Sequence, residues 1–125
     1  MTIEAMTVAP PMRHLLDVDG MTRAEIGRLL DLAIEMRAAR AARAHRSMLE
    51  SETVGLAFYE ASTRTRVSFD LAAKALGATV VDLAIVVSSV SKGESLVDTL
   101  RTLERTGVTI VVLRHSESGA PRAAR

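Results

Sequence analysis

Cysteine is absent from this 125-residue sequence, which excludes a disulfide framework and any metal site built on thiolates. Long apolar runs are missing as well, because no window approaches the ~20 uninterrupted apolar residues of a membrane span. The opening stretch MTIEAMTVAPPMRHLL has neither the basic and apolar regions of a secretory signal nor the arginine-rich, acid-free character of a transit peptide. We therefore expect a cytoplasmic protein that does not bind a membrane.

Charge of one sign is not in excess either, since 16 basic and 15 acidic side chains give a formal net charge of +1. This net charge is too small for the electrostatic field of the protein to attract nucleic acid, so no nucleic-acid partner is expected. Any specificity for anions must therefore come from a local group of residues. With 48% hydrophobic residues, the chain can bury one modest core. One domain, or part of one, is the expectation.

Helical patterns and short apolar runs alternate along most of the chain. Thr22 and Glu25 form a capping-box pattern that predicts a helix from about Arg23 into the mid-forties. Gly77 and Gly107 are expected to end two further helices. The predicted strands cover 53–59, 78–83 and 108–113, and these two helices cover 65–76 and 94–106. The strands are almost wholly apolar, which is typical of parallel strands covered on both faces, so we expect an α/β fold with a doubly wound parallel sheet.

Polar residues that the fold does not require follow each predicted strand. Residues 62–66 come after the first strand, residues 88–92 after the second and Arg114 after the third. In an open parallel sheet, ligands bind outside the carboxyl ends of the strands. The three loops are therefore predicted to converge on one edge and to form one site.

The segment STRTR lies where a strand gives way to a helix, and a helix N-terminus presents unpaired N–H groups and the positive end of the helix dipole. Ser62, Thr63 and Thr65 add hydroxyl donors, and Arg64 offers a planar fork to two phosphate oxygens. This set of donors favours a phosphate group. In the simpler alternative, Ser62 or Thr63 only caps the helix while the arginines lie in water.

Several other polar residues have structural interpretations. Arg66 is expected on a helix face, where it can brace a carboxylate such as Glu60. Ser91 and Glu94 form a second capping-box pattern ahead of a predicted helix. The histidines pair with no residue of catalytic type, so we interpret them as structural or incidental: His14, His45 and His115.

Three motifs, FYEASTRTRVSFDLAAKALGA, SSVSKGESLVDTLRTLE and VVLRHSESGAPR, resemble the catalytic chain of the aspartate carbamoyltransferases. The resemblance extends from about His14 to Arg122. Ser-Thr-Arg-Thr-Arg is shared with the ornithine carbamoyltransferases and identifies the superfamily only. Lys92-Gly93-Glu94 and Arg114-His115 are similar to the aspartate branch, and an ornithine-type enzyme is the less favoured alternative.

The resemblance implies which residues bind the substrates. Carbamoyl phosphate would be held by Ser62, Thr63, Arg64, Thr65 and Arg114, with Arg64, Thr65 and Arg114 acting in catalysis. Ser88 and Lys92 would reach into the active site of the next subunit of a homotrimer and bind aspartate. The implied reaction is attack by the amine of L-aspartate on the carbamoyl carbon, giving N-carbamoyl-L-aspartate and phosphate for pyrimidine biosynthesis. It requires no cofactor, no metal and no covalent enzyme intermediate.

The sequence also departs from the family pattern. Ala61 stands where many relatives have proline, and the His-Pro-x-Gln segment that polarises the carbamoyl carbonyl has no counterpart. Residues 1–125 are therefore expected to be the N-terminal part of a carbamoyl-phosphate-binding domain, without an aspartate-binding domain and inactive alone.

Two alternatives from other functional classes stay open. One is a truncated, non-catalytic fragment that binds phosphate or takes part in assembly. The other is a basic nucleic-acid module, which would use an arginine stripe on the first helix but has no interleaved aromatic residues for base stacking. The residues of that stripe are Arg37, Arg40, Arg43 and Arg46.

Overall fold

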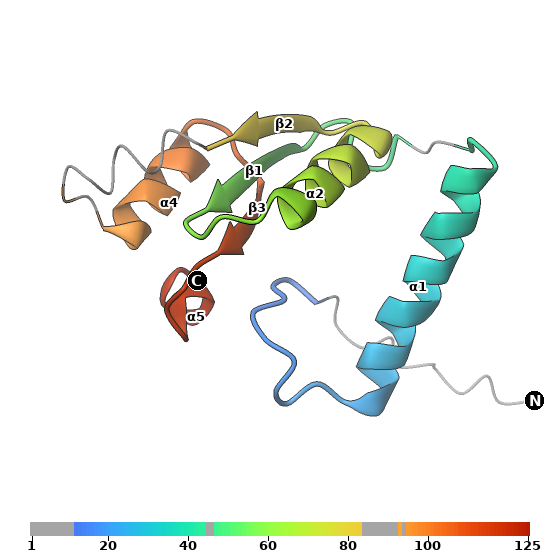
Figure 1. The fold of residues 1–125 in the computed structure, drawn as a ribbon, viewed down its shortest axis with the longest axis horizontal. Coiled ribbons are helices and arrows are strands. Elements are labelled where there is room, and N and C mark those ends of the chain that lie inside the picture. Colours follow the sequence, from blue (N-terminus) through green and yellow to red (C-terminus); the bar gives the residue numbers. More distant parts are fainter. Residues whose placement is uncertain (1–11, 45–46, 84–92, 94) are drawn as a thin grey trace, which may run out of the picture.

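The computed structural model describes residues 12–44, 47–83, 93 and 95–125. Three parallel strands form one sheet in the order β2-β1-β3. The strands are β1 (Thr53–Phe58), β2 (Thr79–Asp82) and β3 (Ile110–Arg114), and the helices are α1 (Arg23–Ala41), α2 (Thr63–Ala75), α4 (Leu96–Arg105) and α5 (Ala120–Ala123). Helices alternate with parallel strands as the apolar runs predicted, so the α/β class is confirmed (Figure 1).

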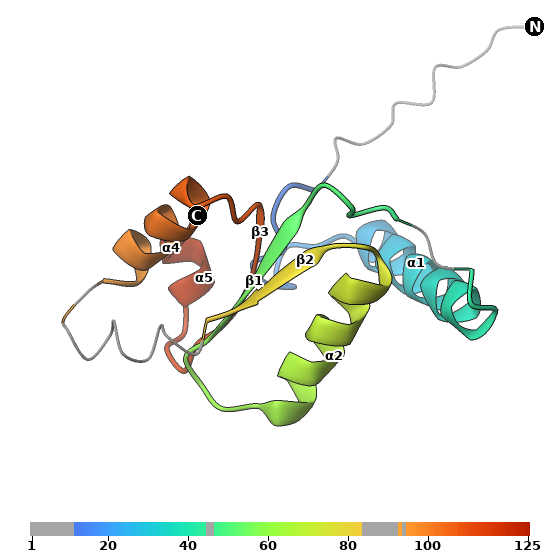
Figure 2. The ribbon, with the colours of Figure 1, turned by 90° about the horizontal axis from the view of Figure 1, so that it is seen from above.

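The central strand β1 is covered on both faces. Val54 and Leu56 pack with Ala73 of α2 on one side of the sheet. On the other side, Ala57 packs with Leu103 of α4. Because neighbouring residues of a strand point to opposite faces, α2 and α4 must lie on opposite sides of the sheet, as Figure 2 shows. This is the doubly wound arrangement that the continuous apolar strands predicted.

Glycine ends two of the helices where the sequence predicted. Gly77, with φ +86°, follows Leu76, the C-cap residue of α2. Gly107, with φ +104°, follows Thr106, the C-cap residue of α4. In this left-handed region a Cβ atom would be strained, so glycine is the favoured residue. After Gly77, the N–H of Ala78 donates to the carbonyl of Ala73 at 3.0 Å, which closes the helix end and turns the chain into β2.

The predicted capping box at the start of α1 is confirmed. The N–H of Thr22 donates to Glu25 Oε2 at 2.7 Å, and the N–H of Glu25 donates to Thr22 Oγ1 at 3.2 Å. The backbone N–H of Thr22, followed by its hydroxyl, which donates to Glu25 Oε2 at 3.0 Å, holds the pKa of the Glu25 carboxyl below its ordinary value. The start of α1 is therefore determined locally.

The far end of α1 differs from the prediction. The helix ends at Ala41 rather than in the mid-forties, because Arg43 adopts a left-handed conformation with φ +52°. The N–H of Arg43 donates to the carbonyl of Arg40, and the N–H of Ala44 donates to that of Ala39, which is the hydrogen-bond pattern of a Schellman cap. Of the four arginines of the predicted stripe, only Arg37 and Arg40 lie on α1, and Arg46 lies outside the described residues.

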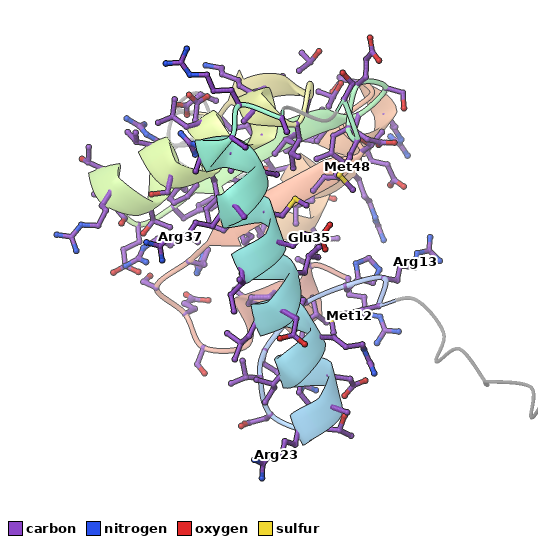
Figure 3. The ribbon with its side chains drawn as sticks, turned by 90° about the vertical axis from the view of Figure 1, so that its right-hand side faces the viewer. Met12, Arg13, Arg23, Glu35, Arg37 and Met48 are labelled. Atoms are coloured by element: carbon purple, nitrogen blue, oxygen red, sulfur yellow. The ribbon has the colours of Figure 1, made fainter. Side chains whose placement is uncertain are left out.

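Helix α1 stands apart from the sheet (Figure 1) and contains no buried residue. Large apolar side chains such as Leu30 (61% exposed) and Ile34 (68% exposed) are open on its surface. Figure 3 shows the side chains of Glu35 and Arg37 projecting from different sides of this helix. No helix in the described ranges is long and apolar enough to cross a membrane.

Helix α4 begins at Leu96, two residues after the predicted start at residue 94, and the capping pattern of Ser91 and Glu94 lies outside the described residues. Its N-cap is Ser95, whose Oγ accepts a hydrogen bond from the N–H of Asp98 at 3.1 Å. Ser95 also donates to the Asp98 carboxylate at 2.7 Å. Asp98 accepts from the Ser95 hydroxyl rather than from the Ser95 N–H, so Ser95 caps α4 without the reciprocal backbone bond of a full capping box.

Candidate anion-binding site

The carboxyl ends of the three strands form one edge of the sheet. Phe58, the last residue of β1, is paired with Arg114, the last residue of β3. Leu56 of β1 is paired with Asp82, which ends β2. The loop that follows β1 leads directly into α2, so the start of this helix lies at the same edge as Arg114 and Asp82. Ser88 and Lys92, predicted to reach a neighbouring subunit, lie outside the described residues.

The start of α2 lacks the side-chain cap that α1 and α4 possess. Ser62 is its N-cap residue, but its hydroxyl makes no capping hydrogen bond and donates instead to Thr65 Oγ1 at 2.9 Å. Thr22 and Ser95, which do cap their helices, have ψ near 155°, whereas Ser62 has ψ 90°. The alternative in which Ser62 caps the helix is therefore wrong.

The first turn of α2 is also electrostatically different from those of α1 and α4. It contains no acidic residue, while α1 has Glu25 and α4 has Asp98 in that position. Arg64 is in this turn and is exposed. Its charge, the positive end of the helix dipole and the uncapped N–H groups all favour an anion at this terminus.

A cleft of about 360 Å³ opens beside this helix terminus. It is lined by residues from the ends of β1 and β2, the loop after β1 and the first turns of α2: Phe58, Tyr59, Ala61, Ser62, Thr63, Arg66, Asp82 and Leu83. Of the predicted carbamoyl phosphate ligands in the described chain, Ser62 and Thr63 line this cleft, whereas Arg64, Thr65 and Arg114 do not. The structure thus brings the predicted ligands to one edge but places only two of them in the wall.

Arg114 is fixed through its backbone and only loosely through its guanidinium. Its carbonyl accepts a hydrogen bond from the N–H of Tyr59 at 2.8 Å. Its Nη2 lies 3.6 Å from Glu60 Oε1, which is an ion pair too long for a hydrogen bond. Its Nε is buried and has no hydrogen-bond partner within the described part of the chain. The guanidinium therefore has donor capacity that the described residues do not use.

Arg66 lies on a helix and pairs with a carboxylate, as predicted, but its partner is Asp82 rather than Glu60. Its Nη1 lies 3.4 Å from Asp82 Oδ2, while Glu60 pairs with Arg114. The reason is the strand order: Arg114 ends β3 opposite the end of β1, beside the loop that carries Glu60, whereas Arg66 lies one turn into α2 and meets the end of β2. Asp82 was not expected in the site, although an acid at the end of an otherwise apolar strand is a visible signal.

His115 packs against Tyr59, with ring centroids 5.1 Å apart. Its Nδ1 accepts a hydrogen bond from the N–H of Glu117 at 3.0 Å. These contacts support the structural interpretation of His115. Within the described ranges, no group of three or more histidine, aspartate or glutamate side chains is placed to hold a metal ion.

Comparison with known protein families identifies a match over residues 13–125. The matching family model is the carbamoyl-P binding domain of the aspartate/ornithine carbamoyltransferases. Among curated proteins, the chain is 48% identical over 114 residues to the aspartate carbamoyltransferase catalytic subunit of Roseiflexus sp. (strain RS-1), covering 90% of this chain and 36% of that protein. It is 50% identical over 110 residues to the corresponding subunit of Chloroflexus aggregans, covering 87% of this chain and 36% of that protein.

Solved structures of aspartate transcarbamoylases are similar to this chain as well. The catalytic subunit of M. jannaschii aspartate transcarbamoylase aligns with a TM-score of 0.81 and 40% identity, over 90% of this chain and 37% of that one. The Trypanosoma cruzi enzyme in complex with carbamoyl phosphate aligns with a TM-score of 0.77 and 34% identity, over 87% of this chain and 35% of that one. The chain thus spans little more than a third of the length of these relatives.

Proposed function

Because the chain belongs to the aspartate/ornithine carbamoyltransferase family, we propose that the start of α2 binds the phosphate group of carbamoyl phosphate. The observation that carries this proposal is the uncapped first turn of α2. In α1 and α4, a hydroxyl accepts from a first-turn N–H and an acid lies in that turn, whereas in α2 the N-cap hydroxyl makes no such bond, no acid is present and Arg64 takes its place. Ser62, Thr63 and Thr65 supply hydroxyls around the same terminus.

The proposed reaction is transfer of the carbamoyl group to the amine of L-aspartate. The amine nitrogen forms a bond to the carbamoyl carbon, which passes through a tetrahedral intermediate. The bond from this carbon to the phosphate oxygen then breaks, and the proton lost by the amine passes to the departing phosphate. Phosphate leaves with the bonding electrons, so negative charge grows at the site that the α2 terminus and Arg64 occupy. Preorganised donors at this position stabilise the departing charge without a covalent enzyme intermediate.

Arg114 is proposed as the second cationic ligand. Its unused Nε hydrogen and its loose 3.6 Å pairing with Glu60 support this role, because little has to be broken before the guanidinium turns toward an anion. Arg114 lies opposite the end of β1, from which the chain continues into the phosphate-binding loop. In this proposal Glu60 holds Arg114 in the absence of substrate, and carbamoyl phosphate competes for it.

The aspartate specificity rests on the relatives, which are named as aspartate carbamoyltransferases. Since the chain spans about 36% of the length of the curated relatives, the complete reaction and both substrates are proposed for the protein rather than demonstrated in this part of it. The same holds for a homotrimer, for Ser88 and Lys92 acting in a neighbouring subunit, and for a cytoplasmic location. Phosphate binding without turnover is the alternative for the 125 residues alone.

The test is a calorimetric titration of carbamoyl phosphate into the purified chain and into its Arg64→Ala variant. Loss of charge-assisted hydrogen bonds, each worth about 1.5–3 kcal/mol, should weaken binding at least tenfold. Arg101→Ala, which removes an exposed arginine from α4, is the matched control and should leave the affinity unchanged. Equal affinities for the Arg64→Ala variant and the unaltered chain would disprove the phosphate site. Product formation with aspartate present separates an enzyme from a binding fragment.

A further inference from the structure

The Arg66–Asp82 ion pair occupies the wall of the cleft and has no role in the function proposed above. Arg66 comes from the second turn of α2 and Asp82 from the end of β2, and both line the cleft together with Ser62 and Thr63. An anion bound at the start of α2 therefore has a positive and a negative side chain close to it. The two charges have opposite effects on such an anion.

The geometry of this pair is poorly suited to stabilising the fold. The distance from Arg66 Nη1 to Asp82 Oδ2 is 3.4 Å, longer than the 2.7–2.9 Å of a strong charge-assisted hydrogen bond. The two side chains are 43% and 46% exposed, so solvent screens their attraction. On the opposite end of the same helix, Lys74 and Asp70 make a closer pair at 2.9 Å. Arg66 is thus held weakly enough to exchange partners.

We propose that Asp82 is a positioning residue that limits the affinity of the cleft for phosphate by holding Arg66 at the end of β2. With Asp82 ionised, the guanidinium of Arg66 is neutralised and an entering phosphate also meets an adverse carboxylate. Without that carboxylate, Arg66 turns to the anion and becomes an additional ligand. The inference rests on the proposed phosphate site and adds to it a residue that prevents the released product from being retained.

The experiment measures the dissociation constant of inorganic phosphate for the purified chain and for a set of variants at Asp82 and Arg66. Asp82→Asn should bind phosphate roughly three- to tenfold more tightly, because it removes one adverse charge and releases Arg66. Asp82→Glu retains the charge and should bind as the unaltered chain does. Asp70→Asn, which makes the same change of net charge in the Lys74 pair away from the cleft, is the matched control and should also leave the affinity unchanged.

The double variant Asp82→Asn/Arg66→Gln decides how Asp82 acts. If Asp82 works through Arg66, the gain from Asp82→Asn is clearly smaller in the Arg66→Gln background, where only the effect of the removed charge remains, and the two substitutions are not additive. If Asp82 acts only through its field, the gain is the same with and without Arg66, and the positioning role is wrong. Circular dichroism of each variant confirms that the fold is intact.

Each remaining outcome also decides the matter. Phosphate binding that Arg64→Ala abolishes but Asp82→Asn leaves unchanged would overturn this inference and leave the proposed function standing. Absence of phosphate binding in the unaltered chain together with binding by Asp82→Asn that requires Arg66 would support it strongly. Absence of binding in every variant would overturn both the inference and the proposed site.

Discussion

Replacing Ser62 by aspartate should stabilise the fold and at the same time weaken phosphate binding. Ser62 is the N-cap residue of α2, yet its hydroxyl donates to Thr65 and caps no backbone N–H. A negative charge at a helix N-terminus contributes about 0.3–1 kcal/mol through the helix dipole. For a chain of this size, such a free energy raises Tm by roughly 1–4 °C. The helix start is therefore less stable than the sequence could make it.

The same carboxylate would occupy the place proposed for the phosphate. It competes for the N–H groups of the first turn and repels the anion from the cleft that Ser62 lines. Since each lost charge-assisted hydrogen bond is worth about 1.5–3 kcal/mol, the affinity for inorganic phosphate should fall at least tenfold. Stability and binding thus change in opposite directions, which a general disturbance of the fold does not produce.

Thermal unfolding followed by circular dichroism and phosphate titration of the same samples test this prediction. Ser62→Ala, which removes the hydroxyl without adding charge, should weaken binding only severalfold and leave Tm nearly unchanged. Ser51→Asp adds the same charge to an exposed turn before β1, at the opposite edge of the sheet, and should not affect phosphate binding. A Ser62→Asp variant with an unchanged Tm and unchanged phosphate affinity would refute the argument that the start of α2 is an anion site.

Two further predictions concern the capped helices. Ser95→Ala removes the hydrogen bond from the N–H of Asp98 and should lower the free energy of unfolding by about 0.5–2 kcal/mol. The variant should therefore have a lower Tm but an unchanged affinity for phosphate. Unchanged stability would show that this cap is dispensable. The pKa of Glu25 is lowered in the folded chain, so the stabilisation it provides is present above its unfolded pKa and is lost as the pH falls through its folded pKa. On acidification, the Tm of Glu25→Gln should therefore fall less than the Tm of the unaltered chain. An equal fall in both would contradict the stabilising role of the Glu25 carboxylate.

Much of the architecture follows from local patterns in the sequence. Thr22 and Glu25 specify the start of α1 through bonds that close within four residues. Gly77 and Gly107 end their helices because the left-handed conformation at those positions favours glycine. Arg43 adopts the same conformation with a Cβ atom, so the end of α1 carries no glycine signal and was placed too late.

The candidate site was predictable to a similar degree. A hydroxyl- and arginine-rich segment between a strand and a helix favours an anion site, and the rule for parallel sheets indicates the edge of the sheet at which this segment lies. The lack of a cap at Ser62 was not predictable, because serine is a favoured N-cap residue and only its backbone conformation keeps its hydroxyl from that role. Asp82 was missed because nothing near it in the sequence marks it as a partner of Arg66.

The sequence by itself determined the local conformations: which residues form strands, where most helices begin and end, and which donors gather after β1. Only the tertiary structure decided the ion pairs, because these depend on the strand order β2-β1-β3 and on its register. Arg66 meets Asp82 from one neighbouring strand, and Glu60 meets Arg114 from the other. Local patterns arise from hydrogen bonds across a few residues, whereas these pairs join residues that are brought together when β2 and β3 take their places on either side of β1.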